Sequence, residues 1–192
     1  MSSTTSDAIV IRTAAPGDYP AIAELTVEAY EADGHLTVEN GYRKTLADVA
    51  GRASSGEILV AAEGSEVVGA VLFLPRPGTP YSELAQPGEA EFRMLAVAPK
   101  AQRRGIGERL VRACLDRARA AGAQAVVISA RDFIQGPLRL YARLGFVRIP
   151  ERDWSPIPGV QLVALKYDLT ASPSNEDSSA PPAAHAPASP SS

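Results

Sequence analysis

Cysteine is nearly absent from this chain of 192 residues, in which Cys114 is the single example. One cysteine excludes an internal disulfide and a metal site built from several cysteines. Its helical spacing with Leu110 and Ala118 indicates a buried core thiol, because free cysteine buries readily. We therefore expect no metal in the working protein.

The sequence also lacks a strong charge excess and long apolar runs. A net charge of −3 argues against a general nucleic-acid binder. No apolar stretch approaches the roughly 20 residues of a membrane span, so we expect no membrane partner. Residues 1–8 have neither a positively charged start nor an apolar segment of the secretory type, which predicts a cytoplasmic protein.

What is present fits one globular domain. The apolar content of 45% and the charged content of 21% are ordinary for such a domain. We expect a flexible leader over residues 1–7 and a folded domain over 8–169. From residue 170 to 192 the composition is dominated by Ser, Ala and Pro, which predicts a disordered tail.

Periodicity and turn signals predict a mixed order of strands and helices. A proline-rich irregular connection is expected over 76–88. The order of strand 89–97, helix 106–120 and strand 125–129 indicates a right-handed crossover connection. The expected strands cover 8–12, 57–62, 66–73, 89–97, 125–129, 146–149 and 160–168, and the expected helices follow Asp18 and cover 42–53, 106–120 and 137–144.

The most informative stretch is Glu91–Leu110, where a strand feeds a glycine-bearing turn into a helix. Small residues let the backbone approach a ligand, and the free amides at a helix N-terminus attract an anion. Arg103 and Arg104 add positive charge to this turn. The P-loop is excluded because no Gly-Lys-Ser/Thr is present, and a Rossmann fingerprint would need glycine where Leu110 stands.

Two blocks in this order resemble the GCN5-related N-acetyltransferases, the GNAT family. Gln102-x-x-Gly105-x-Gly107 after Leu95-Ala96-Val97-x-Pro99 is similar to the family's acetyl-CoA signature. Tyr141 to Phe146 is similar to its Tyr-x-x-x-Gly-Phe helix ending. The resemblance covers about residues 90–146. It implies an α/β fold (α+β by some schemes) in which a mixed, mostly antiparallel central sheet is flanked by helices in a single domain.

The resemblance also implies roles for individual residues. The backbone of Leu95 and Val97 would hydrogen-bond the pantetheine arm, and the Val97 amide would stabilise the oxyanion. Tyr141 would lie near the thioester sulfur and donate a proton or a hydrogen bond to the departing thiolate. The residues implied in acetyl-CoA binding are Leu95, Ala96, Val97, Gln102, Arg103, Arg104, Gly105, Ile106, Gly107, Glu108 and Tyr141.

Two further parts of the site, the base and the acceptor pocket, lie outside these two motifs. Glu91 is our candidate for the base that takes the amine's proton, directly or through a water; a solvated strand end or a salt bridge to Arg93 is the alternative. For the acceptor, Tyr30, Glu31 and Trp154 are the main candidates. Asp33, His35 and Tyr42 are further acidic or polar groups in the same region. Trp154 either walls the acceptor pocket or caps the core.

The sequence thus predicts an acetyl-CoA-dependent N-acetyltransferase that transfers acetyl to a primary amine of a small molecule by direct attack on the thioester. Its partners would be acetyl-CoA and the amine. Two alternatives stay open: a non-catalytic acyl-CoA-binding or sensing module, and an acetyltransferase for protein lysines or N-termini. The oligomeric state also stays open, a homodimer included.

Overall fold

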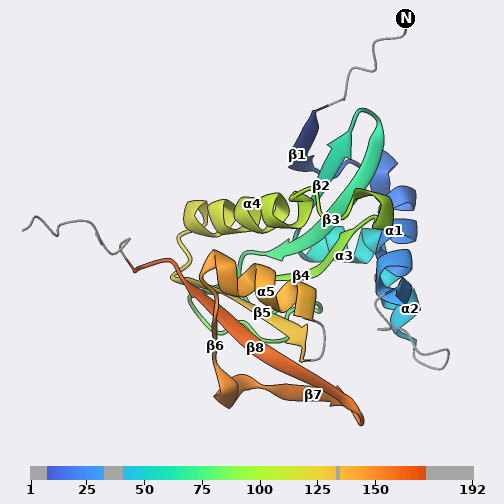
Figure 1. The fold of residues 1–192 in the computed structure, drawn as a ribbon. Helices are drawn as coiled ribbons and strands as arrows, with labels where there is room; N and C mark the ends of the chain where they lie inside the picture. Colours follow the sequence, from blue (N-terminus) through green and yellow to red (C-terminus); the bar gives the residue numbers. More distant parts are fainter. Residues whose placement is uncertain (1–7, 33–40, 133–134, 172–192) are drawn as a thin grey trace, which may run out of the picture.

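The computed structural model describes residues 8–32, 41–132 and 135–171. Their elements, in chain order, are β1 (Ile9–Thr13), η1 (Pro16–Asp18), α1 (Tyr19–Ala32), α2 (Tyr42–Ala47), α3 (Val49–Ser55), β2 (Glu57–Glu63), β3 (Glu66–Leu74), β4 (Glu89–Val97), η2 (Pro99–Ala101), α4 (Ile106–Ala120), β5 (Ala125–Arg131), α5 (Gln135–Leu144), β6 (Val147–Arg148), η3 (Pro150–Arg152), β7 (Trp154–Ile157) and β8 (Val160–Asp168) (Figure 1).

The described strands form one eight-stranded sheet in the order β1-β2-β3-β4-β5-β8-β6, with β7 paired to β8. The pair β4–β5 is parallel, and the other described pairs are antiparallel. A parallel pair needs a crossover connection, and α4 supplies it. The predicted fold class, a mostly antiparallel mixed sheet flanked by helices, is confirmed.

Both faces of the sheet centre are covered. β3 is buried at every position from Val67 to Leu74, which requires packing on both sides. α1 and α4 both contact β3 and β4 (Figure 1). The apolar stripe predicted on α4 is the buried one: Ile106, Leu110, Cys114 and their neighbours form the inward face.

One predicted helix is wrong. The expected helix over 42–53 is two helices, α2 and α3, separated at Asp48. Asp48 has ψ +71°, and its side chain accepts a hydrogen bond from the Gly51 amide at 2.9 Å. An aspartate bonded to nearby backbone in this way competes with helix continuation and caps a new helix. The Asp48 cap therefore breaks the segment.

The C-terminal part departs from the prediction in a second place. β7 was not predicted, because the sequence around Trp154 is rich in proline, which disfavours strands. The strand is four residues long and lies at the margin of the sheet, pairing with β8 alone. The final hairpin of β7 and β8 extends away from the rest of the sheet (Figure 1).

Candidate active site

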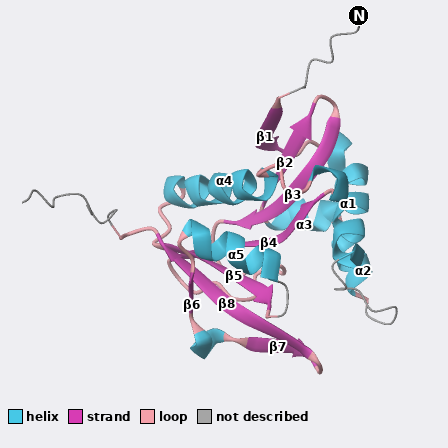
Figure 2. Ribbon diagram, viewed as in Figure 1, coloured by secondary structure: helices cyan, strands magenta, loops and turns pink. Residues whose placement is uncertain are grey.

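The sheet splits between β4 and β5. The two strands pair over three residues, from Glu89 opposite Ala125 to Glu91 opposite Val127, and their ladder ends there. Beyond that point the strands diverge (Figure 2). A cavity of about 390 Å³ occupies the split, lined by Phe92 to Leu95 from β4 and by Ile128 to Arg131 from β5.

A bulge shapes the β4 side of this cavity. Between Ala70 opposite Ala96 and Leu72 opposite Arg93, β3 contributes one residue and β4 two. Met94, one of the two residues on β4, has φ +54°, a backbone conformation that residues other than glycine rarely adopt. Such a conformation costs about 1–3 kcal/mol and tends to occur at functional sites, as bulges do. Met94 and Leu95, the two residues of the bulge, both line the cavity.

The turn before α4 has the geometry of an anion site. Arg103 (φ +61°) and Gly105 (φ +74°) both have left-handed backbone conformations. In the described residues, none of the amides from Arg103 to Glu108 donates to a backbone carbonyl; Arg109 is the first that does, to Gly105 at 3.1 Å. These amides therefore lie at the positive end of the α4 dipole without backbone partners.

The charged side chains of the turn are not equally available. Arg104 donates to both carboxylate oxygens of Glu63 at 2.9 and 2.7 Å, and this contact lowers the pKa of Glu63. Glu108 accepts from Arg112 and from Arg143 of α5. Arg103 is exposed and has no ion pair among the described residues. Of the two arginines in the turn, Arg103 is the one with an unengaged charge.

α5 connects this turn to the cavity. A Cβ placed on Gly107 would lie 3.5 Å from Leu140 of α5 and 3.9 Å from Val97 at the end of β4. The next residue on α5, Tyr141, lines the cavity. Val97 of β4, Gly107 of α4 and Leu140 of α5 therefore lie close together, one residue from Tyr141 in the cavity wall.

Tyr141 is buried in an aromatic cluster. Its ring centroid lies 6.0 Å from that of Phe92 and 5.7 Å from that of Phe146. Its hydroxyl makes no hydrogen bond within the part of the chain that the structure describes. Burial raises the pKa of the phenol, so it is neutral and protonated at physiological pH. The hydroxyl is free to donate to a ligand in the cavity.

Glu91 has surroundings that its sequence position did not reveal. Its side chain is fully buried and does not line the cavity. One carboxylate oxygen accepts the backbone amides of Glu83, Leu84 and Ala85, each at 3.1 Å. The distance from the Arg93 guanidinium to the other oxygen is 4.0 Å. Glu91 thus holds the β3–β4 connection.

The acceptor end of the cavity is lined by polar and aromatic side chains, and two of these residues were not predicted from the sequence. Glu83 and Arg93 both line it, with a 2.5 Å contact between carboxylate and guanidinium. Tyr30 and Tyr42 also line it, with ring centroids 6.0 Å apart. Burial raises the pKa of both tyrosines. Glu83 lies in an irregular connection without a motif, so no sequence signal marked it.

The other acceptor candidates lie outside the cavity wall. Glu31 forms an exposed ion pair with Arg43. Trp154 does not line the cavity, but its indole N–H donates to Ser129 Oγ at 3.1 Å, and Ser129 does line it. The candidates Asp33 and His35 lie outside the described residues.

Two kinds of feature are absent from the described residues. No helix there is long and apolar enough to cross a membrane. No cluster of three or more His, Cys, Asp or Glu side chains in that part of the chain is arranged to hold a metal ion.

Known proteins resemble this chain in sequence and in fold. N-acetyltransferase 8F1 of Rattus norvegicus is 31% identical over 118 residues, which make up 58% of this chain. The match spans about half (50%) of that relative's length.

Solved structures show the same fold at low identity. A GNAT-family acetyltransferase from Staphylococcus aureus Mu50 matches with a TM-score of 0.68 at 14% identity, covering 84% of this chain and 99% of its own. The protein yncA from Salmonella typhimurium, solved with its cofactor acetyl-CoA, matches with a TM-score of 0.63 at 23% identity. The match covers 89% of this chain and 99% of yncA. The model of the acetyltransferase (GNAT) family matches residues 19–146, more than half of the sequence, and the chain therefore belongs to that family.

Proposed function

We propose that this protein is an acetyl-CoA-dependent N-acetyltransferase that acts on a primary amine of a small molecule. The observation that carries the proposal is the cavity in the split between β4 and β5. The cavity is lined by Leu95, which lies in the bulge of β4, and by Tyr141, whose phenol is neutral. Cavities of a few hundred Å³ are typical of small-molecule sites.

The residues present fit acetyl-CoA. The free amides from Arg103 to Glu108 would hold the pyrophosphate, assisted by the α4 dipole and the Arg103 charge. The pantetheine arm would lie along the edge of β4 that β5 leaves unpaired, at Leu95 to Val97, as an added strand does. The thioester would then lie in the cavity.

The proposed reaction is direct acyl transfer. The amine nitrogen bonds to the acetyl carbonyl carbon, and the carbon–sulfur bond breaks with its electron pair on sulfur. The Val97 amide would donate to the carbonyl oxygen as it gains charge. Tyr141 would donate to the departing sulfur. Because burial raises the pKa of this phenol far above that of a thiol, a hydrogen bond is favoured over full proton transfer.

The acceptor end offers an amine one carboxylate and two aromatic rings. The carboxylate is that of Glu83, which lines the cavity together with the guanidinium groups of Arg93 and Arg131. The rings of Tyr30 and Tyr42 offer faces that attract a cation. A small amine-bearing molecule with an apolar body matches this wall.

Calorimetric titration with acetyl-CoA tests the first half of the proposal, and release of free thiol across a panel of amines tests the second. We expect saturable binding and turnover with at least one amine. No binding at high micromolar acetyl-CoA would refute the proposal. Binding without turnover across many amines and peptides would favour a non-catalytic acyl-CoA module, and turnover with peptides alone would favour a protein acetyltransferase.

A further inference from the structure

The buried carboxylate of Glu91 is bound to the backbone of the β3–β4 connection. Three successive backbone amides, from Glu83 to Ala85, converge on one of its oxygens. Successive amides of this kind form a concave anion site. To accept a proton from a substrate, Glu91 would have to give up contacts that fix the backbone of this connection.

The side chain of Glu83 faces the other way from its amide. While the amide donates to Glu91, the carboxylate lines the cavity and lies 2.5 Å from the Arg93 guanidinium. Its side chain retains 28% exposure, whereas that of Glu91 has none. Of the two carboxylates, Glu83 is the one that a bound amine can reach.

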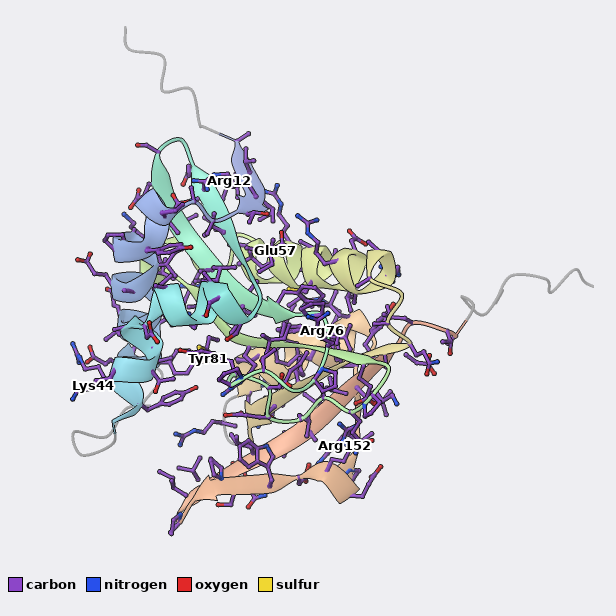
Figure 3. The ribbon with its side chains drawn as sticks, turned by 180° about the vertical axis from the view of Figure 1, so that it is seen from behind. Arg12, Lys44, Glu57, Arg76, Tyr81 and Arg152 are labelled. Atoms are coloured by element: carbon purple, nitrogen blue, oxygen red, sulfur yellow. The ribbon has the colours of Figure 1, made fainter. Side chains whose placement is uncertain are left out.

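The connection that carries Glu83 is held at several further points. Arg93 donates to the Tyr81 carbonyl at 2.5 Å, and Arg152 donates to the Leu84 carbonyl. Arg152 also binds both oxygens of the buried Glu89, at 3.0 and 2.9 Å. Tyr81 belongs to the connection itself, and Arg152 reaches it from η3 (Figure 3). A base on a connection held in this way needs little reorganisation at the moment of reaction.

The charges around Glu83 also suit a base. Burial raises the pKa of Glu83; Arg93 opposes this effect and the negative charge of Glu91 adds to it. Tyr42 of α2 is a further titratable neighbour, and Tyr30 and Arg131 line the same cavity. A carboxylate acts best as a base when its pKa is raised toward the working pH.

We propose that Glu83 is the general base of the reaction and that Glu91 is a positioning residue that holds it. This inference rests on the proposed function. The attacking amine loses one N–H proton to the Glu83 carboxylate as its nitrogen bonds to the acetyl carbon, and Glu83 later releases that proton to water. Glu91 does not exchange a proton with substrate.

The test is the pH dependence of kcat in the full chain, with the fastest amine of a panel of aliphatic, aryl-alkyl and diamine acceptors. In Glu83→Gln we expect kcat to fall about 100-fold or more. We also expect the fall of kcat on the acid side of the pH profile, here called the acid-side decline, to move up in Glu83→Gln to the pKa of the amine itself. In Glu91→Gln we expect a loss of up to about 100-fold from misplacement, with the acid-side decline retained. That decline should shift slightly to lower pH, because a neighbouring negative charge is removed.

Three results would overturn the inference: a decline that moves up to the pKa of the amine in Glu91→Gln alone, in both variants, or in neither. Since Glu91→Gln is a buried change, Glu83→Ala with added formate gives an independent measurement. We expect formate to restore part of kcat in Glu83→Ala; no recovery contradicts the inference. The control is Glu24→Gln, exposed on α1, with unchanged kcat.

Failure of the inference is distinguishable from failure of the proposed function. If the unmodified protein binds acetyl-CoA and releases thiol with an amine, and Glu83→Gln has the same kcat and pH profile, only the assignment of the base is wrong. If the unmodified protein neither binds acetyl-CoA nor releases thiol, the proposed function itself is wrong.

Discussion

Replacing Tyr141 by phenylalanine removes one hydroxyl from the cavity and leaves the ring in place. The ring packs against Phe92 and Phe146, and those contacts do not involve the oxygen. The hydroxyl has no hydrogen-bond partner among the described residues, so its loss leaves no group of the protein unpaired. The variant therefore separates chemistry from packing.

The expected magnitude follows from the role of the hydroxyl. A hydrogen bond to a charged group is worth about 1.5–3 kcal/mol, which corresponds to about a 10- to 150-fold loss in kcat. Because the substitution preserves the shape of the side chain, the free energy of unfolding should change by less than about 1.5 kcal/mol. The affinity for acetyl-CoA should not change, since the bond to sulfur strengthens only as the thiolate departs.

The assay is steady-state thiol release, combined with calorimetric titration of acetyl-CoA and denaturant unfolding of the same samples. Tyr141→Ala serves as the packing control, because truncating a buried aromatic costs about 3–5 kcal/mol of stability. A kcat of Tyr141→Phe within twofold of the unmodified protein would refute the role assigned to the hydroxyl. A loss of acetyl-CoA affinity as large as the loss of kcat would refute it equally.

Three further predictions concern the turn, the acceptor end and the sheet. Gly105→Ala should lower the free energy of unfolding by about 1–2 kcal/mol in denaturant titrations, because Gly105 has φ +74°. Trp154→Phe removes the 3.1 Å hydrogen bond to Ser129, and kinetics should show a raised KM for the amine with an unchanged acetyl-CoA affinity. Burial pushes the pKa of Glu89 up, but hydrogen bonds from Arg152 and its other partners outweigh this and lower it. Glu89 therefore contributes stability above its unfolded pKa of about 4.3 that is lost as pH falls toward the folded value. Denaturant unfolding from pH 7 to pH 3 should show this loss in the unmodified protein. Glu89→Gln should be destabilised by about 3–5 kcal/mol at pH 7 and respond less to acid.

The sequence predicted the fold best where local signals and tertiary packing agree. The bounds of β4 (Glu89–Val97) and α4 (Ile106–Ala120) are those expected, since proline, glycine and a clear apolar stripe mark them. The hairpin of β2 and β3 was also predicted by its turn residues. Where one side chain altered the backbone, as Asp48 does between α2 and α3, the apolar pattern alone was insufficient.

The site was only half predictable from the sequence, for a physical reason. The turn before α4 and the helix of Tyr141 are contiguous segments with characteristic residues. The acceptor end is assembled from α1, α2, β4, β7 and β8 together with the β3–β4 connection, and its members share no spacing. Glu91 and Glu83 illustrate this: both are acidic and near β4, and only the direction in which each side chain points distinguishes them.

The measurement that tests the account most directly is calorimetric titration of the full chain with acetyl-CoA, repeated with Gly105→Ala. We predict saturable binding of one acetyl-CoA per chain within the range of about 1 μM to 1 mM typical of enzyme substrates. We also predict weaker binding in the variant, because the strained turn no longer presents its amides in the same arrangement. No saturable heat up to about 1 mM acetyl-CoA would contradict the central claim, that the turn from Gln102 to Glu108 and the split between β4 and β5 form an acetyl-CoA site.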